Sequence, residues 1–329
     1  MNLQPQFEHI TKLIEQAKRR AYQKVNTEIV DLYWNIGAYL HLQVNQKNWG
    51  KSIIKQLAIH LKNKQPNIKG FSSQNLWRMK QFYETYKNDT KLSTLLREIP
   101  WSHNIAILST AKSDEEKEFY IKLVIKERLS FRELERQINS SYYERVMLGN
   151  TKLSTLSREF PQDINNIFKD TYVLEMLQLP INHSEKELKQ KITQNISKFL
   201  LEFGRDFAFM GEEYPLQVGN QDFAIDLLFY HRTLQCMVAI ELKIEKFKPA
   251  HLGQLNFYLE ALDKDIKTTN ENPSIGILLC KGKDDIVVEY ALNRSLSPTL
   301  VADYKTQLPN KQLLKQKWQE ILQELDKKN

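Results

Sequence analysis

Three ionisable residues interrupt two apolar segments that follow each other in the sequence. Asp226 lies within FAIDLLFY, and Glu241 and Lys243 lie within VAIELKI. A short polar turn at residues 231–233 separates the segments, so they are expected to pair as a β-hairpin. Because side chains alternate along a strand, Glu241 and Lys243 share one face, and the hairpin returns them close to Asp226.

Two carboxylates and an ammonium group among apolar neighbours need a compensating interaction, because buried charge is costly unless it is paired or bound to a metal. A divalent cation such as Mg2+ prefers carboxylate oxygens and keeps positions for water and phosphate. It would activate a water molecule and neutralise phosphate charge, while Lys243 would hold the nucleophile or stabilise the transition state. The alternative is a structural ion pair at a strand end, and the spacing alone leaves both interpretations open.

The Glu-x-Lys spacing occurs three times in the chain, in three different contexts. The copies at 115–117 and 187–189 lie in charged helical segments and are expected to face solvent. Only the copy at 241–243 lies in an apolar strand that follows a buried-looking aspartate. This context favours residues 241–243 as the site of chemistry.

Two neighbouring helical segments add candidates. A helix starting near Pro249 places Gln254 and Tyr258 four residues apart, on one face. Glu202 ends the preceding helix, three residues after Phe199, and so lies near its inward edge. Each has a structural alternative, with Gln254 in solvent, Tyr258 in the core and Glu202 as a surface charge.

The elements around these residues indicate two domains, as the length of 329 residues also suggests. Residues 1–150 show helical periodicity, which begins in long helices over the first 45 residues. Residues 166–310 combine helices with strand-like runs such as SIGILLC and TLVADY, which predicts an α/β domain around one sheet. Residues 151–165 lack periodicity and are interpreted as a linker, and residues 311–329 as a C-terminal helix.

The basic residues concentrate in the first half of the chain. Residues 1–150 carry 24 basic and 15 acidic side chains, whereas the remainder is slightly acidic. Between residues 47 and 83 there are eight basic residues and no acidic one, a field that suits a polyanion. Helices at 53–64 and 73–86 resemble a helix-turn-helix in outline, although the turn is long. The alternatives are a solvated surface, self-association or a protein partner.

Several residue types in and before the second of these helices can contact base edges or phosphates. The candidates are Lys47, Lys51, Lys55, Gln74, Asn75, Arg78 and Lys80.

The order helix, strand, strand with Asp226, strand with Glu241-x-Lys243, and helix with Gln254-x-x-x-Tyr258 resembles the RecB-like branch of the PD-(D/E)xK nucleases. The whole chain resembles the YhcG-type family of bacterial nucleases, over nearly all of residues 7–305. Matching strings include GFSSQNLWRMKQFY, WSHNIAIL, SFRELERQI and VAIELKIEKFKPAHLGQLNFYL.

This resemblance implies a restriction-endonuclease-like fold, with a mixed central sheet flanked by helices, behind a helical N-terminal domain. It implies that Asp226 and Glu241 bind Mg2+ or Mn2+ and that Lys243 is the catalytic lysine. It also implies that Gln254 and Tyr258 position substrate and that Glu202 is a further acid at the metal site. Ile225 replaces the proline that gives the motif its name.

The expected function is metal-dependent hydrolysis of DNA, with endonuclease action favoured and a role in defence, repair or recombination expected from the family. The alternatives are an RNA nuclease, a non-catalytic nucleic-acid-binding module and a partner-recruiting protein. We expect a cytoplasmic protein with no membrane partner, because no long apolar segment or secretory signal appears in the sequence. A homo-oligomer is left open, since two sites are needed to cut both strands together.

Overall fold

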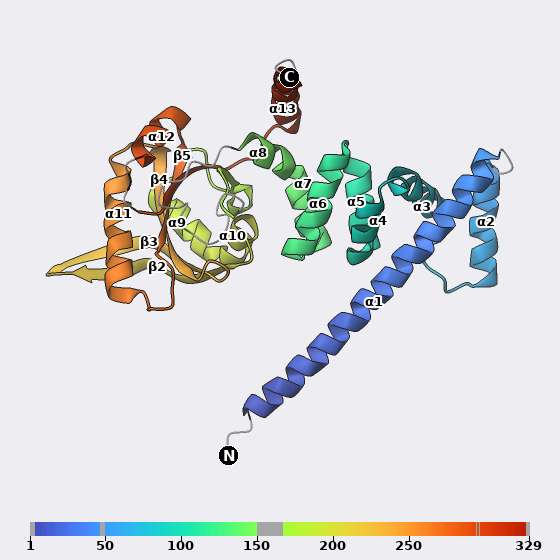
Figure 1. The fold of residues 1–329 in the computed structure, drawn as a ribbon, viewed down its shortest axis with the longest axis horizontal. Coiled ribbons are helices and arrows are strands. Elements are labelled where there is room, and N and C mark those ends of the chain that lie inside the picture. The colour runs from blue at the N-terminus through green and yellow to red at the C-terminus, as the bar shows by residue number, and fades with distance from the viewer. Residues whose placement is uncertain (1–3, 47–49, 150–166, 294, 296, 327–329) are drawn as a thin grey trace. The chain divides into compact units, whose positions relative to one another are not determined.

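The structure is a computed structural model that describes residues 4–46, 50–149, 167–293, 295 and 297–326 (Figure 1). The chain divides into two compact units, Met1–Arg136 and Gln137–Asn329, which we describe separately. The division lies before the one expected at residue 150, and the expected linker, residues 151–165, lies outside the described residues. None of the described helices combines the length and apolar character needed to cross a bilayer.

The first unit is helical, as its periodicity predicts. Its elements are α1 (Gln4–Asn45), α2 (Lys51–Lys64), α3 (Ser73–Tyr86), α4 (Thr90–Leu95), a 3-10 turn (Leu96–Glu98), α5 (Trp101–Thr110) and α6 (Asp114–Glu127), with α7 (Phe131–Asn139) at its end. Side-chain caps fix several helix starts: Ser72 accepts a hydrogen bond from the Asn75 amide, and Ser113 accepts one from the Glu116 amide.

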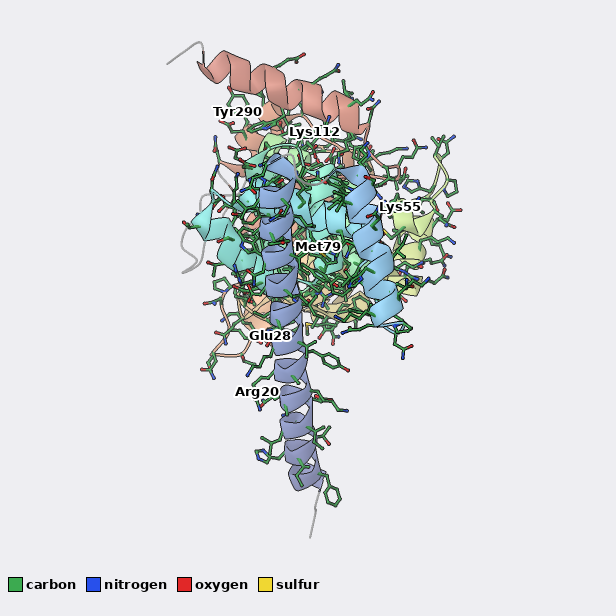
Figure 2. The ribbon with its side chains drawn as sticks, turned by 90° about the vertical axis from the view of Figure 1, so that its right-hand side faces the viewer. Arg20, Glu28, Lys55, Met79, Lys112 and Tyr290 are labelled. Atoms are coloured by element: carbon green, nitrogen blue, oxygen red, sulfur yellow. The ribbon has the colours of Figure 1, made fainter. Side chains whose placement is uncertain are left out.

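Helix α1 carries two apolar faces. One face packs on α3 through Tyr33 and Leu40, and Gly37 allows the close approach, since a Cβ there would lie 2.2 Å from the Met79 carbonyl oxygen. The first half of α1, which carries Arg20, extends beyond the other helices of its unit (Figures 1 and 2). A second face is exposed along the helix; its large apolar members are Phe7, Ile10, Ile14, Val25, Leu32 and Tyr39.

The second unit contains one six-stranded mixed sheet. Its strands are β1 (Thr171–Val173), β2 (Phe207–Val218), β3 (Gln221–His231), β4 (Cys236–Lys246), β5 (Ile275–Gly282) and β6 (Thr299–Lys305), in the order β1-β6-β5-β4-β3-β2. Strands β2, β3 and β4 are antiparallel to their neighbours in a meander, whereas β4, β5, β6 and β1 are parallel. The runs FAFM and PLQV join into the single strand β2 at the edge of the sheet, a position that tolerates a proline such as Pro215.

Helices cover both faces of this sheet (Figure 1). One core cluster joins the sheet to α9 (Glu185–Gln194) and α10 (Ile196–Phe203), and the other joins it to α11 (His251–Ala261) and α12 (Asp285–Leu292). The remaining elements are α8 (Tyr142–Leu148), a 3-10 turn (Glu175–Leu177), a π-helical turn (Leu262–Ile266) and α13 (Lys311–Asp326). The sequence thus correctly predicts a helical N-terminal region and a sheet domain flanked by helices.

Candidate active site

The candidate site lies where β3 and β4 separate. Their backbone pairing confirms the predicted hairpin and ends at Leu227 opposite Ile240, so Asp226 and Glu241 occupy the next position on each strand. The Leu242 amide donates a 3.0 Å hydrogen bond to Asp226 Oδ2. The Asp226 carboxylate therefore accepts the hydrogen bond of a β4 amide that lies beyond the last paired residues. This contact fixes the position of one carboxylate oxygen.

Glu241 and Lys243 form an ion pair on β4, as their shared face predicts. The distance from Lys243 Nζ to Glu241 Oε1 is 2.8 Å, and Glu241 is only 2% exposed. The second carboxylate oxygen, Glu241 Oε2, is buried and has no hydrogen-bond partner among the described residues. Such an oxygen is costly to bury, so it is the best candidate in this site for an additional ligand.

Burial and charge shift the pKa values of this pair. Burial is the main cause that raises the pKa of Glu241 to about 7, and the Asp226 charge adds to it, while Lys243 opposes both. Burial would lower the pKa of Lys243, but its hydrogen bond to Glu241 and the nearby carboxylates outweigh burial and raise it. At neutral pH, Lys243 is therefore a firmly protonated cation beside a carboxyl group that is only partly ionised.

Helix α9 contributes two further charged groups. Lys189 Nζ lies 2.9 Å from Asp226 Oδ1 and 2.9 Å from Glu213 Oε1 of β2, and Glu185 Oε1 lies 3.7 Å from Lys243 Nζ. The expectation that the 187–189 copy of Glu-x-Lys faces solvent is wrong for Lys189, although Glu187 is exposed and closes the capping box with Ser184.

A signal for these residues is present in the sequence. Glu185 and Lys189 are four residues apart and lie on the same side of α9 as the core residues Leu188 and Ile192. Two charged side chains that border a buried helical stripe face the sheet and need partners there.

Gln254 and Tyr258 meet on α11, as their spacing predicts. Gln254 is exposed, and its side-chain amide donates a 2.7 Å hydrogen bond to the Tyr258 hydroxyl. Tyr258 is 4% exposed and packs in the core cluster beneath α11. Among the described contacts, none joins this pair to Asp226 or Glu241.

Glu202 lies in a different cluster from the one predicted. Its side chain is fully buried, where it accepts a 2.9 Å hydrogen bond from Arg145 and a 3.0 Å hydrogen bond from the Val173 amide, with Lys169 Nζ at 3.4 Å. These contacts tie α10 to α8 and β1, so the alternative of a surface charge is wrong, and no described contact joins Glu202, the expected metal-site acid, to Asp226 or Glu241. The helical acid near the Glu241–Lys243 pair is Glu185.

The site fits a divalent cation through its chemistry. Asp226 and Glu241 present hard carboxylate oxygens at adjacent positions of two strands, and Glu241 Oε2 accepts no hydrogen bond from the part of the chain that the structure describes, which suits Mg2+ or Mn2+. Within the described part of the chain, no group of three or more His, Cys, Asp or Glu side chains forms a metal cluster. The remaining ligands would therefore come from the Leu242 carbonyl, water and substrate.

The residues of the first unit that were predicted to contact nucleic acid form two groups: some side chains are exposed, and others bond to neighbouring residues of the unit. Lys51, Lys55, Gln74 and Arg78 are exposed. Asn75 bonds to the Gly70 carbonyl and to Trp101, and Lys80 pairs with Glu84 at 2.6 Å, so these two predicted contacts are already engaged within the unit. Lys47 lies outside the described residues.

Sequence comparison shows the class of protein that this fold and site define. Residues 165–320 match the family model described as the YhcG PDDEXK nuclease domain. The second unit is thus a PD-(D/E)xK nuclease domain of restriction-endonuclease-like fold, in agreement with its mixed sheet and flanking helices. Residues 9–145 match the model described as the DUF1016 N-terminal domain. The chain therefore belongs to the family of YhcG-type nucleases that join these two domains.

Individual proteins resemble this chain in sequence or in structure, with different identities and coverage. A protein of Escherichia coli (strain K12) with the name "Putative nuclease YhcG" is 29% identical over 343 residues, which cover 93% of this chain and 90% of that protein. Solved structures with partial similarity include a repair endonuclease from Pyrococcus abyssi (17% identity, TM-score 0.28) and EndoMS in a complex with dsDNA (18% identity, TM-score 0.27). These matches cover 40% of this chain and 50% and 48% of the respective solved chains.

Proposed function

We propose that this chain is a metal-dependent endonuclease that hydrolyses phosphodiester bonds in DNA, with Mg2+ or Mn2+ as its cofactor. The observation that carries the proposal is the position of Asp226 and Glu241 at the point where two strands separate, with Lys243 2.8 Å from Glu241. The Glu241 oxygen that has no hydrogen-bond partner within the described ranges, and the match to a nuclease family, support the same conclusion.

Each side chain has a distinct role in this proposal. Asp226 and Glu241 would hold the cation, which supplies an activated water and neutralises charge on the phosphate. Lys243 would stabilise the negative charge that develops on the phosphoryl oxygens, because its raised pKa keeps it protonated. The exposed amide of Gln254, oriented by the Tyr258 hydroxyl, would position the nucleic acid. Hydrolysis adds water across one P–O bond and leaves a phosphate and a hydroxyl end.

The test is nicking of supercoiled plasmid by the purified full-length protein in Mg2+, Mn2+ or EDTA. We expect metal-dependent nicking that is lost in Asp226→Ala and Lys243→Ala and retained in Glu260→Gln, a control on the exposed side of α11. Equal nicking by the wild type and Asp226→Ala would refute the assignment of the site. Cleavage of RNA but not DNA would select the RNA nuclease, and salt-sensitive binding without cleavage would select a binding module.

We propose that the first unit binds the nucleic acid through α2. Lys51, Lys55 and Lys62 lie at positions i, i+4 and i+11 of this helix, which places them on one face, and all three are exposed. No ion pair within the described residues involves them, and residues 51–83 contain no acid. This stripe, rather than Asn75 and Lys80, is the surface that would neutralise phosphates, and Gln74 and Arg78 on α3 remain available for base or phosphate contacts.

We also propose that the protein forms a homo-oligomer, because the exposed face of α1 repeats apolar residues along a helix whose other face is covered by α3. Light scattering should show a dimer that becomes a monomer in the Ile10→Asp, Ile14→Asp variant, and a wild-type monomer at micromolar concentration would refute this.

A cytoplasmic location is proposed from the two buried free thiols, Cys236 and Cys280. Roles in defence, repair or recombination are proposed from the family alone.

A further inference from the structure

Lys189 occupies a position that the proposed metal chemistry does not use. Its ammonium group lies 2.9 Å from Asp226 Oδ1, and Asp226 Oδ2 already accepts the Leu242 amide. Both oxygens of this carboxylate are therefore engaged in the described structure. A cation that binds Asp226 through Oδ1 must compete with an ammonium group for that oxygen.

Electrostatics makes this competition strong. Lys189 is 15% exposed, and its ammonium group lies 2.9 Å from a carboxylate oxygen of Asp226 and 2.9 Å from one of Glu213. It therefore places a positive charge directly on the oxygen that the metal would use. Two cations on one carboxylate oxygen repel each other strongly in a partly buried site, because screening by water is weak there.

Glu213 gives Lys189 a second carboxylate to hold. Its Oε1 is 2.9 Å from Lys189 Nζ, and its side chain is 68% exposed, so this partner lies toward solvent. Lys189 can therefore leave Asp226 without losing its ion pair.

The backbone at Glu213 has an unusual conformation. Glu213 has a φ of +44°, a left-handed value that is rare for residues with a side chain, within the edge strand β2. The β2–β3 pairing includes Glu212 with Leu227 and Tyr214 with Ile225, and skips Glu213 and Asp226 between them. Strained backbone of this kind is often retained at functional sites, and here it lies opposite Asp226 and carries the second partner of Lys189.

We propose that Lys189 is a counter-ion that is exchanged when the metal site is filled. It holds Asp226 in the metal-free protein, releases Oδ1 to the entering cation, and is then retained by Glu213 alone. Lys189 and Glu213 are positioning residues that set the affinity and the exchange of the metal. This inference rests on the proposed metal-binding function of Asp226 and Glu241.

The test is direct titration of the full-length protein with Mn2+, following free Mn2+ by its electron paramagnetic resonance signal at pH 8. We expect Lys189→Met to bind Mn2+ about tenfold more tightly than the wild type, because the competing charge is gone. Lys189→Gln is a second variant in case the methionine disturbs folding, which circular dichroism would report. Weaker or unchanged Mn2+ binding in folded variants would overturn the proposal.

Glu213 provides an independent arm of the test. Glu213→Gln should weaken Mn2+ binding several-fold, whereas the control Glu212→Gln, which removes a carboxylate that accepts from Thr193, should not. In the Lys189→Met background, Glu213→Gln should have no further effect, because no lysine remains to be retained. An equal effect in both backgrounds would show that Glu213 acts through its own charge and would overturn the exchange.

The same titration separates this inference from the proposed function. Asp226→Asn should abolish Mn2+ binding at the site. If the wild type binds no Mn2+, or binds it no better than Asp226→Asn does, the proposed metal-dependent function fails and the exchange fails with it. If the wild type binds and Lys189→Met does not bind more tightly, only the exchange fails.

Discussion

Replacing Glu241 with glutamine should stabilise the metal-free protein at alkaline pH while it removes a proposed metal ligand. The pKa of Glu241 is raised from an ordinary value of 4.5 to about 7, mainly by burial. The folded protein therefore binds this proton more tightly than the unfolded chain does. Stability that comes from this group is fully present below about pH 4.5 and is lost as the pH rises to about 7.

The size of the effect follows from the shift. A pKa unit corresponds to about 1.4 kcal/mol, so a carboxylate that is forced to ionise costs up to roughly 3 kcal/mol at pH 8. The Glu241 side chain is only 3% exposed, so solvent screens little of this cost. Glutamine avoids the cost but removes the carboxylate 2.8 Å from Lys243, whose other ion pair among the described residues is the more distant one with Glu185, at 3.7 Å. We therefore expect a net gain of about 1–2 kcal/mol.

The assay is thermal unfolding in EDTA at pH 5 and pH 8.5. For a unit of this size, the gain corresponds to roughly 2–8 °C at pH 8.5, and it should be much smaller at pH 5. Added Mn2+ should raise the melting temperature of the wild type and have little effect on the variant. The reasoning about burial and charge would be refuted if the variant were less stable than the wild type and the loss of stability were the same at pH 8.5 and at pH 5.

Three further outcomes are expected. Arg145→Met should lower the free energy of unfolding by about 3–5 kcal/mol in urea, because it leaves the buried Glu202 without its guanidinium partner; a loss below 1 kcal/mol would contradict this. Gly37→Ala should lower the melting temperature of the first unit, because its Cβ would collide with the Met79 carbonyl, whereas Gly50→Ala, whose Cβ would meet no described atom within 4 Å, should not. Reversing Lys51, Lys55 and Lys62 to glutamate should weaken DNA binding and its salt dependence in fluorescence anisotropy, unlike reversal of Lys91, which pairs with Glu118; an unchanged salt slope would exclude this face.

The central part of the site could be predicted because it depends on local rules. The alternation of side chains along a strand places Glu241 and Lys243 on one face, and the β3–β4 hairpin brings them next to Asp226. Helical period places Gln254 next to Tyr258 in the same way. These relations need only the geometry of one strand, one hairpin or one helix.

The remaining contacts depend on packing between elements that are distant in the sequence. The pairing of Glu202 with Arg145 joins residues 57 positions apart, and Lys189 reaches Asp226 across 37. A glutamate at a helix end can be a ligand, a surface charge or half of a buried pair, and sequence spacing does not distinguish these. For the same reason, Asn75 and Lys80 have the residue types of a reading helix but are engaged by Trp101 and Glu84.

The charges around the site explain why both α9 residues belong to it. Asp226, Glu241, Glu185 and Glu213 face Lys189 and Lys243, so full ionisation leaves two net negative charges and attracts a divalent cation. A divalent ion would neutralise this excess. Without Lys189 the filled site would carry one net negative charge and would repel a phosphodiester, so the lysine that competes with the metal also favours the next ligand. Tighter metal binding by Lys189→Met should therefore come with weaker binding of DNA.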